Sequence, residues 1–297
     1  MDIAITGSSG FLGTALCRSL TADGHRVIKV VRRPVENSEP ALRWDPAAGT
    51  IDAGALEGLD AVVHLAGAGI GDKRWNAERR REILESRTKG TRLLSETLAA
   101  LDSKPPVLVS GSAIGFYGEQ GDEVCTEQTP AGDVFLSEIC VGWEAATQAA
   151  VDAGIRVSFL RTGIVLDPSG GVLKRLLLLF KPALGGRLGS GRQWWSWISL
   201  HDQIAAMRWL IDHDVAGPVN LTAPEPVTNA AFTKTLGAAL HRPTLLAVPS
   251  FAPKLLLGAD MAQQLLFISE RVIPAVLERE GFTFRHRTLD DALAELL

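Results

Sequence analysis

The part of this chain that most constrains its fold is a glycine-rich segment near the N-terminus, Thr6-Gly7-Ser8-Ser9-Gly10-Phe11-Leu12-Gly13. It follows a strand-like run over residues 3–6 and precedes a helical pattern over 12–22. In such a strand–turn–helix, the first glycine permits a tight turn, the second lets a pyrophosphate approach the backbone, and the third lets the helix pack on the strand. Free N–H groups at the helix N-terminus attract phosphate. We therefore predict a phosphate-binding loop; the alternative is a tight turn without a ligand.

Strand-like and helical patterns alternate through the first half of the chain. The further strand-like runs are 27–31, 61–66, 107–110 and 157–160, and the further helical patterns are 78–101 and 136–153. Nearly unbroken apolar strands that alternate with helices are typical of a parallel sheet covered on both faces. We therefore predict an α/β fold in which residues 1–162 form a Rossmann-type, doubly wound parallel sheet with its ligand at the carboxyl ends of the strands.

The pattern changes after residue 162. Residues 163–199 are rich in Gly, Trp and Leu, and residues 218–297 mix short strands with short helices. We predict that residues 163–297 form a smaller, mixed, substrate-side region. A helix near 201–213 is expected to return to the main sheet, and Asp202 at its start is interpreted as structural.

Three tryptophans, Trp194, Trp195 and Trp197, lie close to Arg192 in this second half. Their ring faces could stack on a planar or sugar ring while Arg192 holds a phosphate or carboxylate. Neighbouring side chains of an extended segment point in opposite directions, so at most two of the three rings could line one pocket. The alternative is a tryptophan cluster that packs the smaller region onto the sheet.

Composition and charge exclude several classes of protein. The 297 residues carry a net charge of −4 without a basic stripe, so no nucleic-acid partner is expected. Cys17, Cys125 and Cys140 form no CxxC pair, which argues against a disulfide framework or a metal site and favours a reducing compartment. The N-terminal residues do not resemble a signal peptide, and the longest apolar run, 176–180, is too short to cross a membrane. We expect a cytoplasmic monomer or homodimer that binds a small molecule.

The residues after the second strand indicate which nucleotide is bound. NAD-specific proteins of this fold place an Asp or Glu there, about 20 residues past the glycines, to hold the ribose 2′-OH. This chain has Arg32 and Arg33 instead. A guanidinium can pair bidentately with the 2′-phosphate of NADP, and Ser8 or Ser9 could add a hydroxyl donor. We predict NADP as the cofactor, with Arg32 as the first choice; the alternative is two solvated surface arginines.

Segments along the whole chain resemble a known family. Residues 6–13, 60–67 and 110–118 are similar to extended short-chain dehydrogenase/reductases. More narrowly, the chain resembles the atypical "epimerase family" branch, often described as nucleoside-diphosphate-sugar epimerases. The further matching segments are 74–75, 86–87, 143–146, 160–166, 189–194, 226–229, 242–243 and 281–284.

The resemblance implies cofactor contacts outside the glycine loop, at Leu65, Ala66, Gly67, Glu82, Arg87, Ser110 and Val165. Leu65 and Ala66 are expected to run beside the adenosine and ribose, and Val165 is expected at the nicotinamide end. For Glu82 and Arg87 the alternative is a solvated, charged helix face.

Most active members of the superfamily carry a Tyr-x-x-x-Lys pair, in which the lysine lowers the tyrosine pKa so that the tyrosine can move a proton. This chain lacks the pair. The tyrosine slot falls on Ile139 or Cys140, and the lysine slot falls on Trp143 or Glu144, depending on the register.

Three residues are candidates for proton transfer in its place. Ser112 matches the catalytic serine position of the superfamily, Tyr117 is the only tyrosine in the chain, and Cys140 lies one helical turn from Glu144. Each has a structural alternative: Ser112 as a simple hydrogen-bonding group, Tyr117 as a loop anchor, Cys140 as a small buried hydrophobe and Glu144 as the partner of an arginine. We favour Ser112.

The sequence leaves two functions open. One is an NADP-dependent oxidoreductase or epimerase that acts on a small polar substrate, such as a nucleotide sugar. The other is a non-catalytic NADP-binding sensor or scaffold. The phosphate loop and the Gly- and Trp-rich segment favour a ligand-binding site, whereas the missing dyad favours the second function or chemistry by other residues.

Overall fold

The computed structural model describes residues 1–32 and 41–297. Its largest element is an eight-stranded sheet with the strand order β13-β8-β6-β5-β1-β2-β3-β4. Neighbouring strands run parallel throughout, except that β4 pairs antiparallel with β3. The strands are β1 (Asp2–Thr6), β2 (Arg26–Val31), β3 (Ala41–Asp45), β4 (Thr50–Ile51), β5 (Ala61–His64), β6 (Val107–Ala113), β8 (Arg156–Thr162) and β13 (Gly217–Leu221). The predicted doubly wound parallel sheet is confirmed.

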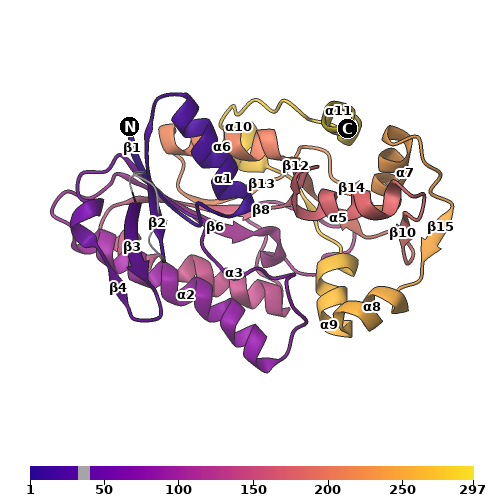
Figure 1. Cartoon of the computed structure of the whole chain (residues 1–297), viewed down its shortest axis with the longest axis horizontal. Helices are drawn as coiled ribbons and strands as arrows, with labels where there is room; N and C mark the ends of the chain where they lie inside the picture. The colour runs from indigo at the N-terminus through magenta and orange to yellow at the C-terminus, as the bar shows by residue number, and fades with distance from the viewer. Residues whose placement is uncertain (33–40) are drawn as a thin grey trace.

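Helices cover both faces of this sheet (Figure 1). On one face lie α1 (Phe11–Ala22) and α6 (Leu200–Asp212), and on the other lie α2 (Ala77–Ala100), α3 (Phe135–Ala145) and α4 (Gln148–Asp152). Successive side chains of a strand point to opposite faces. Accordingly, Ile3 and Ile5 of β1 enter the core beneath α1 and α6, whereas Ala4 enters the core beneath α2.

The helix predicted over 136–153 is two helices, α3 and α4, and a side chain from another helix contacts the backbone at the break. The Ser95 hydroxyl of α2 donates to the carbonyl of Thr147 (2.9 Å) and accepts the N–H of Ala150 (2.8 Å). The Thr147 carbonyl also accepts the N–H groups of Ala150 (2.9 Å) and Val151 (3.3 Å), so Ser95 adds to the hydrogen bonds of the first turn of α4. The helix predicted over 78–101 is confirmed as α2.

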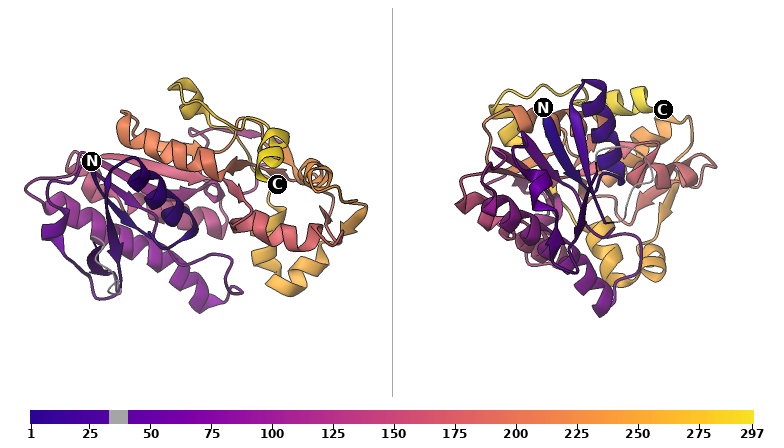
Figure 2. Two further views of the ribbon diagram at one scale, coloured as in Figure 1. Left: turned by 45° about the horizontal axis from the view of Figure 1, so that its top comes forward. Right: turned by 60° about the vertical axis from the view of Figure 1, so that its left-hand side comes forward.

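The second half of the chain builds a smaller region at one end of the sheet (Figures 1 and 2). Its strands are β9 (Ile164–Asp167), which pairs with β12 (Trp197–Ser199); β10 (Gly186–Leu188), which pairs with β15 (Leu246–Val248); and β11 (Trp194–Trp195), which pairs with β14 (Val227–Thr228). A further pair joins β7 (Val124–Cys125) to β16 (Arg271–Val272). Its helices are α5 (Gly171–Phe180), α7 (Asn229–Ala239), α8 (Phe251–Leu257), α9 (Ala259–Ala262), α10 (Ala275–Arg279) and α11 (Leu289–Leu296), with a π-helical turn at Gln263–Phe267. The 3₁₀ turns at Ala53–Leu56 and Ile114–Phe116 lie in the first half of the chain.

Two elements of the second half belong to the main sheet. α6, the helix found near 201–213, packs beside α1. β13 then extends the sheet beyond β8, although the sequence analysis placed its residues in the smaller region. Among the described residues, no helix is long and apolar enough to cross a membrane.

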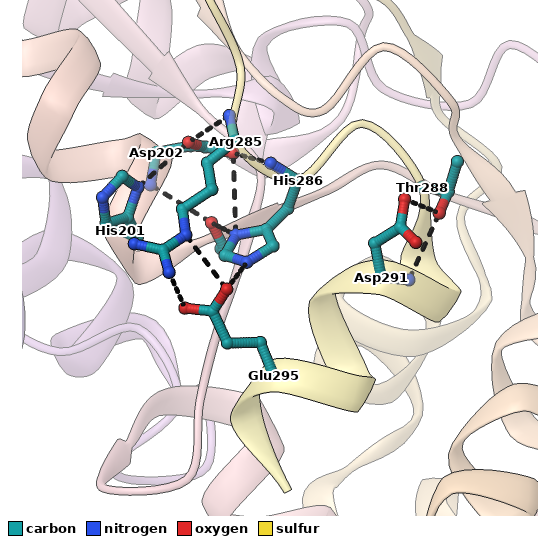
Figure 3. Close-up of polar contacts among 8 residues, drawn as sticks. His201, Asp202, Arg285, His286, Thr288, Asp291 and Glu295 are labelled. Carbon is teal, nitrogen blue, oxygen red and sulfur yellow. Dashed lines mark hydrogen bonds and ion pairs between the residues drawn. The ribbon is translucent and has the colours of Figure 1, made fainter.

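Asp202 fastens the C-terminal segment to the start of α6 (Figure 3). Its carboxylate oxygens accept the backbone N–H groups of Arg285 (3.0 Å) and His286 (2.9 Å). The His286 ring nitrogens contact the Ser199 hydroxyl (2.9 Å) and a Glu295 carboxylate oxygen (3.0 Å). Asp202 is almost fully buried, and this network supports its interpretation as a structural residue.

We expect Asp202→Ala to lower the free energy of unfolding by about 2–4 kcal/mol, because it leaves buried backbone N–H groups without an acceptor. Chemical denaturation followed by circular dichroism would measure the change. The matched control is His201→Ala, because the exposed His201 ring contacts Asp202 at 3.2 Å and lies edge-on to the His286 ring (6.0 Å) but accepts neither backbone N–H group. Equal stabilities of the two variants would contradict the assigned role.

Candidate functional site

The glycine loop is shaped by two very close backbone approaches. Gly7 has φ +68°, and a Cβ there would lie 2.8 Å from the carbonyl carbon of Leu65. A Cβ on Gly13 would lie 2.2 Å from the carbonyl oxygen of Gly7, so only glycine lets α1 pack onto the turn. Gly10 is the N-cap of α1, and within the described residues no side chain caps this end. Its first N–H groups are therefore available to an anion.

The other residues of the loop have different surroundings. Ser8 is buried and its carbonyl accepts the Thr14 hydroxyl (3.2 Å), whereas Ser9 is exposed. Phe11 packs against Gly170, where an added Cβ would lie 2.4 Å from the ring. Leu12 packs against the core beneath α1. Of the two serines, Ser9 is the one whose side chain reaches solvent.

A buried hydrogen-bonded chain fixes the segment that follows β5. The Thr6 hydroxyl accepts the N–H groups of Leu65 (3.1 Å) and Ala66 (3.2 Å), so its own proton is directed to His64 Nδ1 (2.7 Å). His64 Nε2 then carries the ring proton and donates to the Thr91 hydroxyl (2.8 Å). Burial lowers the pKa of His64 to about 4, so the ring is neutral at pH 7. The link holds Leu65 and Ala66 beside the glycine loop.

Arg32 lies at the same edge of the sheet as the glycine loop. β1 and β2 are parallel with Thr6 opposite Val30, and Arg32 comes directly after β2 with an exposed side chain. Its guanidinium can therefore reach a group bound beside the loop. Arg33 lies outside the described residues.

Arg87 and Glu82, both on α2, occupy different environments. Arg87 is buried, donates to the carbonyl of Ala68 (3.0 Å) and lies over the Trp143 ring (4.8 Å). Its Nε atom has no hydrogen-bond partner among the residues described. No described carboxylate forms an ion pair with its guanidinium. Glu82 is exposed and pairs with Arg79 (2.6 Å). The solvated-face alternative therefore fails for Arg87.

The remaining residues assigned to the cofactor by resemblance lie shortly after β5, within β6 and within β9. Gly67 is in contact range of Arg87, because an added Cβ would lie 3.1 Å from the guanidinium carbon. Ser110 of β6 is fully buried, and its hydroxyl has no partner in the described part of the chain. Val165 of β9 is half-buried and pairs with Ile198 of β12.

Ser112 joins a buried ion pair. Its hydroxyl donates to Glu144 Oε1 (2.7 Å), and the Arg161 guanidinium holds both oxygens of the same carboxylate (2.9 Å each). The side chains of Arg161 and Glu144 are only 5% and 11% exposed. Glu144 is thus the partner of an arginine, and the Ser112 proton is directed towards Glu144. Ser112 can accept a hydrogen bond as it stands, but it must leave Glu144 to donate one to a substrate.

Tyr117 anchors the loop after β6. The residue is fully buried, its hydroxyl donates to Asn220 Oδ1 (2.6 Å), and it accepts a hydrogen bond from Arg161 (3.1 Å). Burial raises the pKa of Tyr117 well above its usual value. The geometry favours the anchoring alternative over the catalytic hypothesis for this residue.

Cys140 and Glu144 share the face of α3 that packs on β6. The Cys140 thiol lies 3.6 Å from the carbonyl oxygen of Ala113. Burial raises the pKa of the thiol to about 12, so almost no thiolate forms at neutral pH. The geometry favours the small buried hydrophobe over the proton-transfer hypothesis.

The tryptophans of the second half pack the smaller region together. Trp197 is fully buried, and Trp195 lies edge-to-face with Phe232 (5.1 Å) in the same core. The stacking hypothesis is wrong for these two rings. Trp194 donates to Asp122 (2.8 Å) and lies beneath the Arg271 guanidinium (4.4 Å).

A cavity of about 440 Å³ opens beside this cluster. Its walls carry charges of both signs, from Arg192, Lys254, Glu119 and Asp122. Arg192 is exposed there, as a residue that holds a polar ligand would be. The cavity is therefore a polar recess with charged residues in its walls.

Residues 3–222 match the family model described as the NAD dependent epimerase/dehydratase family. The chain belongs to this family. Residues 248–296 match a separate domain of unknown function, DUF1731. Epimerase family proteins of Mycobacterium bovis and Mycobacterium tuberculosis are each 46% identical to this chain over 292 residues. These residues cover 98% of this chain and 96% of each relative.

Solved structures of family members are similar over the full chain. The human epimerase family protein SDR39U1, solved with NADPH, has a TM-score of 0.91 and 33% identity, and the match covers 100% of this chain and 99% of that one. A nucleoside-diphosphate sugar epimerase from Corynebacterium glutamicum has a TM-score of 0.81 and 37% identity, and this chain spans 58% of it. The resemblance to atypical extended short-chain dehydrogenase/reductases is confirmed.

The described residues of this epimerase family member fit a nicotinamide dinucleotide. The close approaches at Gly7 and Gly13 bring the N-terminus of α1 to the edge of the sheet. The buried Arg87 is a cation that the described carboxylates leave unpaired, and a ligand anion would satisfy it. Both features are those of an NAD(P)-binding site.

Three residues of the network around Ser112 are absent from the candidates named in the sequence analysis. Arg161 is a charged residue within a strand of the parallel sheet, which is a signal that could have been noticed. Asn220 gives its backbone N–H to Glu127 Oε1 (3.1 Å), and this oxygen also accepts the N–H of Val276 (3.1 Å). Glu127 lies in an irregular loop, and no local pattern marks it.

We expect Cys140 to resist alkylation by iodoacetamide at pH 8 at least about 100-fold more than the urea-unfolded chain, because a thiol with a pKa near 12 is only about one part in 10⁴ thiolate. Mass spectrometry of the Cys140 peptide would follow the reaction. Labelling of the folded protein at the rate of the unfolded chain would contradict the buried assignment.

Proposed function

We propose that this protein binds NADP(H) and acts as an oxidoreductase or epimerase on a small polar substrate, with a nucleotide sugar as one candidate. The observation that carries the proposal is that Arg32 follows β2 at the same edge of the sheet as the glycine loop and the free N-terminus of α1. A guanidinium there suits the 2′-phosphate that distinguishes NADP from NAD. The human relative solved with NADPH supports the same choice.

Bound NADP(H) would donate or accept a hydride at its nicotinamide. The residues of the chain would orient the substrate and move the proton. Ser112, at the end of a central parallel strand, is our candidate for the group that contacts the reacting oxygen, because such sheets gather ligands there. Glu144 and Arg161 position the Ser112 hydroxyl.

A second candidate is a non-catalytic NADP-binding sensor or scaffold. The observation that favours it is that both positions of the missing tyrosine, Ile139 and Cys140, are buried core residues. A cytoplasmic location, the monomer or homodimer state and the division at residue 162 stay predictions.

We expect NADPH to bind at least about tenfold more tightly than NADH, because one charge-assisted bidentate pair contributes about 1.5–3 kcal/mol. Arg32→Ala should remove most of this preference and leave NADH binding unchanged. Titration of cofactor fluorescence would measure both affinities. Arg26→Ala is the matched control, since Arg26 is exposed at the opposite end of β2 and pairs with Asp2. Equal affinity of the unaltered protein for both nucleotides would refute the role of Arg32.

We expect Ser112→Ala to slow turnover by about 10²–10³, the cost of removing one positioned donor. The measurement is single-turnover oxidation of bound NADPH with a panel of small carbonyl compounds and nucleotide sugars. Cys140→Ser is the control and should have a smaller effect. A Ser112→Ala protein that matches the parent would defeat the assignment. Tight NADPH binding without turnover of any compound would instead favour the sensor.

A further inference from the structure

One carboxylate oxygen in the smaller region is buried without a partner. Glu270 lies between the π-helical turn and β16, and its Oε1 atom is shielded from solvent with no hydrogen-bond partner in the described residues. Shielding a carboxyl oxygen from water without a donor is unfavourable, so such a group calls for an explanation. A ligand group that completes its hydrogen bonding would supply one.

Hydrogen bonds hold the backbone of Glu270 beside Ser196, which in turn bonds the start of β9. The Ser196 hydroxyl donates to the Glu270 carbonyl (2.7 Å) and accepts the N–H of Val272 (2.8 Å). The Ser196 carbonyl in turn accepts the N–H of Ile164 (2.9 Å), the residue before Val165. Glu270 is therefore fixed close to the segment that we expect at the nicotinamide end of the cofactor.

The charged and titratable groups around the carboxyl come from three other segments. Glu119 follows the 3₁₀ turn after β6, Cys125 lies on β7 and Cys140 lies on α3. Glu270 raises the pKa values of both thiols, although burial is the main cause in each case. Cys140 occupies one of the two positions of the missing tyrosine, so the charge of the Glu270 carboxyl acts on that position.

We propose that Glu270 is the acid–base residue of this family member and exchanges a proton with the substrate in place of the Tyr-x-x-x-Lys pair. The inference rests on the proposed NADP-dependent function. In the reductive direction, Glu270 gives its proton to a carbonyl oxygen while the carbonyl carbon receives a hydride from the reduced nicotinamide. The products are the alcohol, the oxidised cofactor and the Glu270 carboxylate. The oxidative direction returns both the proton and the hydride.

The protonation state of Glu270 suits this task better than that of the earlier candidates. Burial, with a further contribution from the Glu119 carboxylate, raises the pKa of Glu270 to about 8. A group with a pKa near the working pH is both protonated often enough and acidic enough to transfer a proton. Cys140 has a pKa near 12, and the Ser112 proton is directed to Glu144.

A test is available that needs no substrate. The nicotinamide ring is positively charged in NADP⁺ and neutral in NADPH, so a nearby carboxylate favours NADP⁺ and a nearby neutral carboxyl does not. As the pH rises from 6.5 to 9, Glu270 loses its proton. The ratio of the Kd for NADPH to the Kd for NADP⁺ should therefore rise, by about threefold to tenfold. The phosphates are common to both forms of the cofactor, so their titration cancels in this ratio.

Isothermal titration calorimetry with NADP⁺ and NADPH across this range would measure the ratio for the parent and three variants. Glu270→Gln should make the ratio independent of pH. Glu119→Gln should move the transition to lower pH, because it removes the neighbouring negative charge. Glu123→Gln is the matched control, since Glu123 is an exposed carboxylate of the same loop, and it should behave as the parent does.

A pH-independent ratio in the parent, or a ratio that still changes in a folded Glu270→Gln protein, would overturn the role of Glu270 and leave the proposed function intact. Failure of the parent to bind either nucleotide would overturn the proposed function, and this inference with it. A Glu119→Gln transition at the pH of the parent would contradict the assigned neighbour and count against the placement of Glu270.

Discussion

The ion pair between Glu144 of α3 and Arg161 of β8 holds together the groups at the carboxyl end of β6. It is almost fully shielded from solvent, and the Arg161 guanidinium also reaches Tyr117 and lies over the Phe116 ring (3.4 Å). Removing one member of such a pair would leave an uncompensated buried charge. The pair therefore ties a helix, a strand and a loop into one arrangement. The pair also gives a structural role to Glu144, which is one of the two residues at the lysine position.

The two halves of the site are built by different physical means. The cofactor half depends on the backbone: Gly7 and Gly13 permit approaches that no side chain would allow, and the neutral His64 fixes the segment after β5. The chemical half depends on side chains that come from distant parts of the sequence. The proposed acid–base residue, Glu270, comes from the second half of the chain, where its backbone carbonyl accepts a hydrogen bond from the Ser196 hydroxyl. This division explains how the nucleotide-binding features can be retained while the usual dyad is absent.

The same division decides what could be predicted from the sequence. The strand–turn–helix that carries the glycine loop, the parallel sheet and α2 follow from local patterns, and the structure confirms these elements. The break between α3 and α4 was not predicted, and the contact that Ser95 of a different helix makes there has no local sequence signal. Predicting that Arg161 is the partner of Glu144 would have required knowledge that β6 and β8 are neighbours. Glu270 has no sequence signal at all, because only the fold brings it near Cys140.

The attachment of the C-terminal segment bears on the order in which the chain acquires its structure during synthesis. β13 is an edge strand, and α10 packs against it while Asn220 donates to the carbonyl of Ile273 (3.0 Å). Asp202 likewise cannot form its hydrogen bonds to the backbone of Arg285 and His286 until these residues have been synthesised. A ribosome releases these partners last, so the sheet formed by the earlier strands keeps an uncovered edge until translation is nearly finished. A chain stalled before residue 270 would carry its nucleotide loop but expose that edge to other nascent chains.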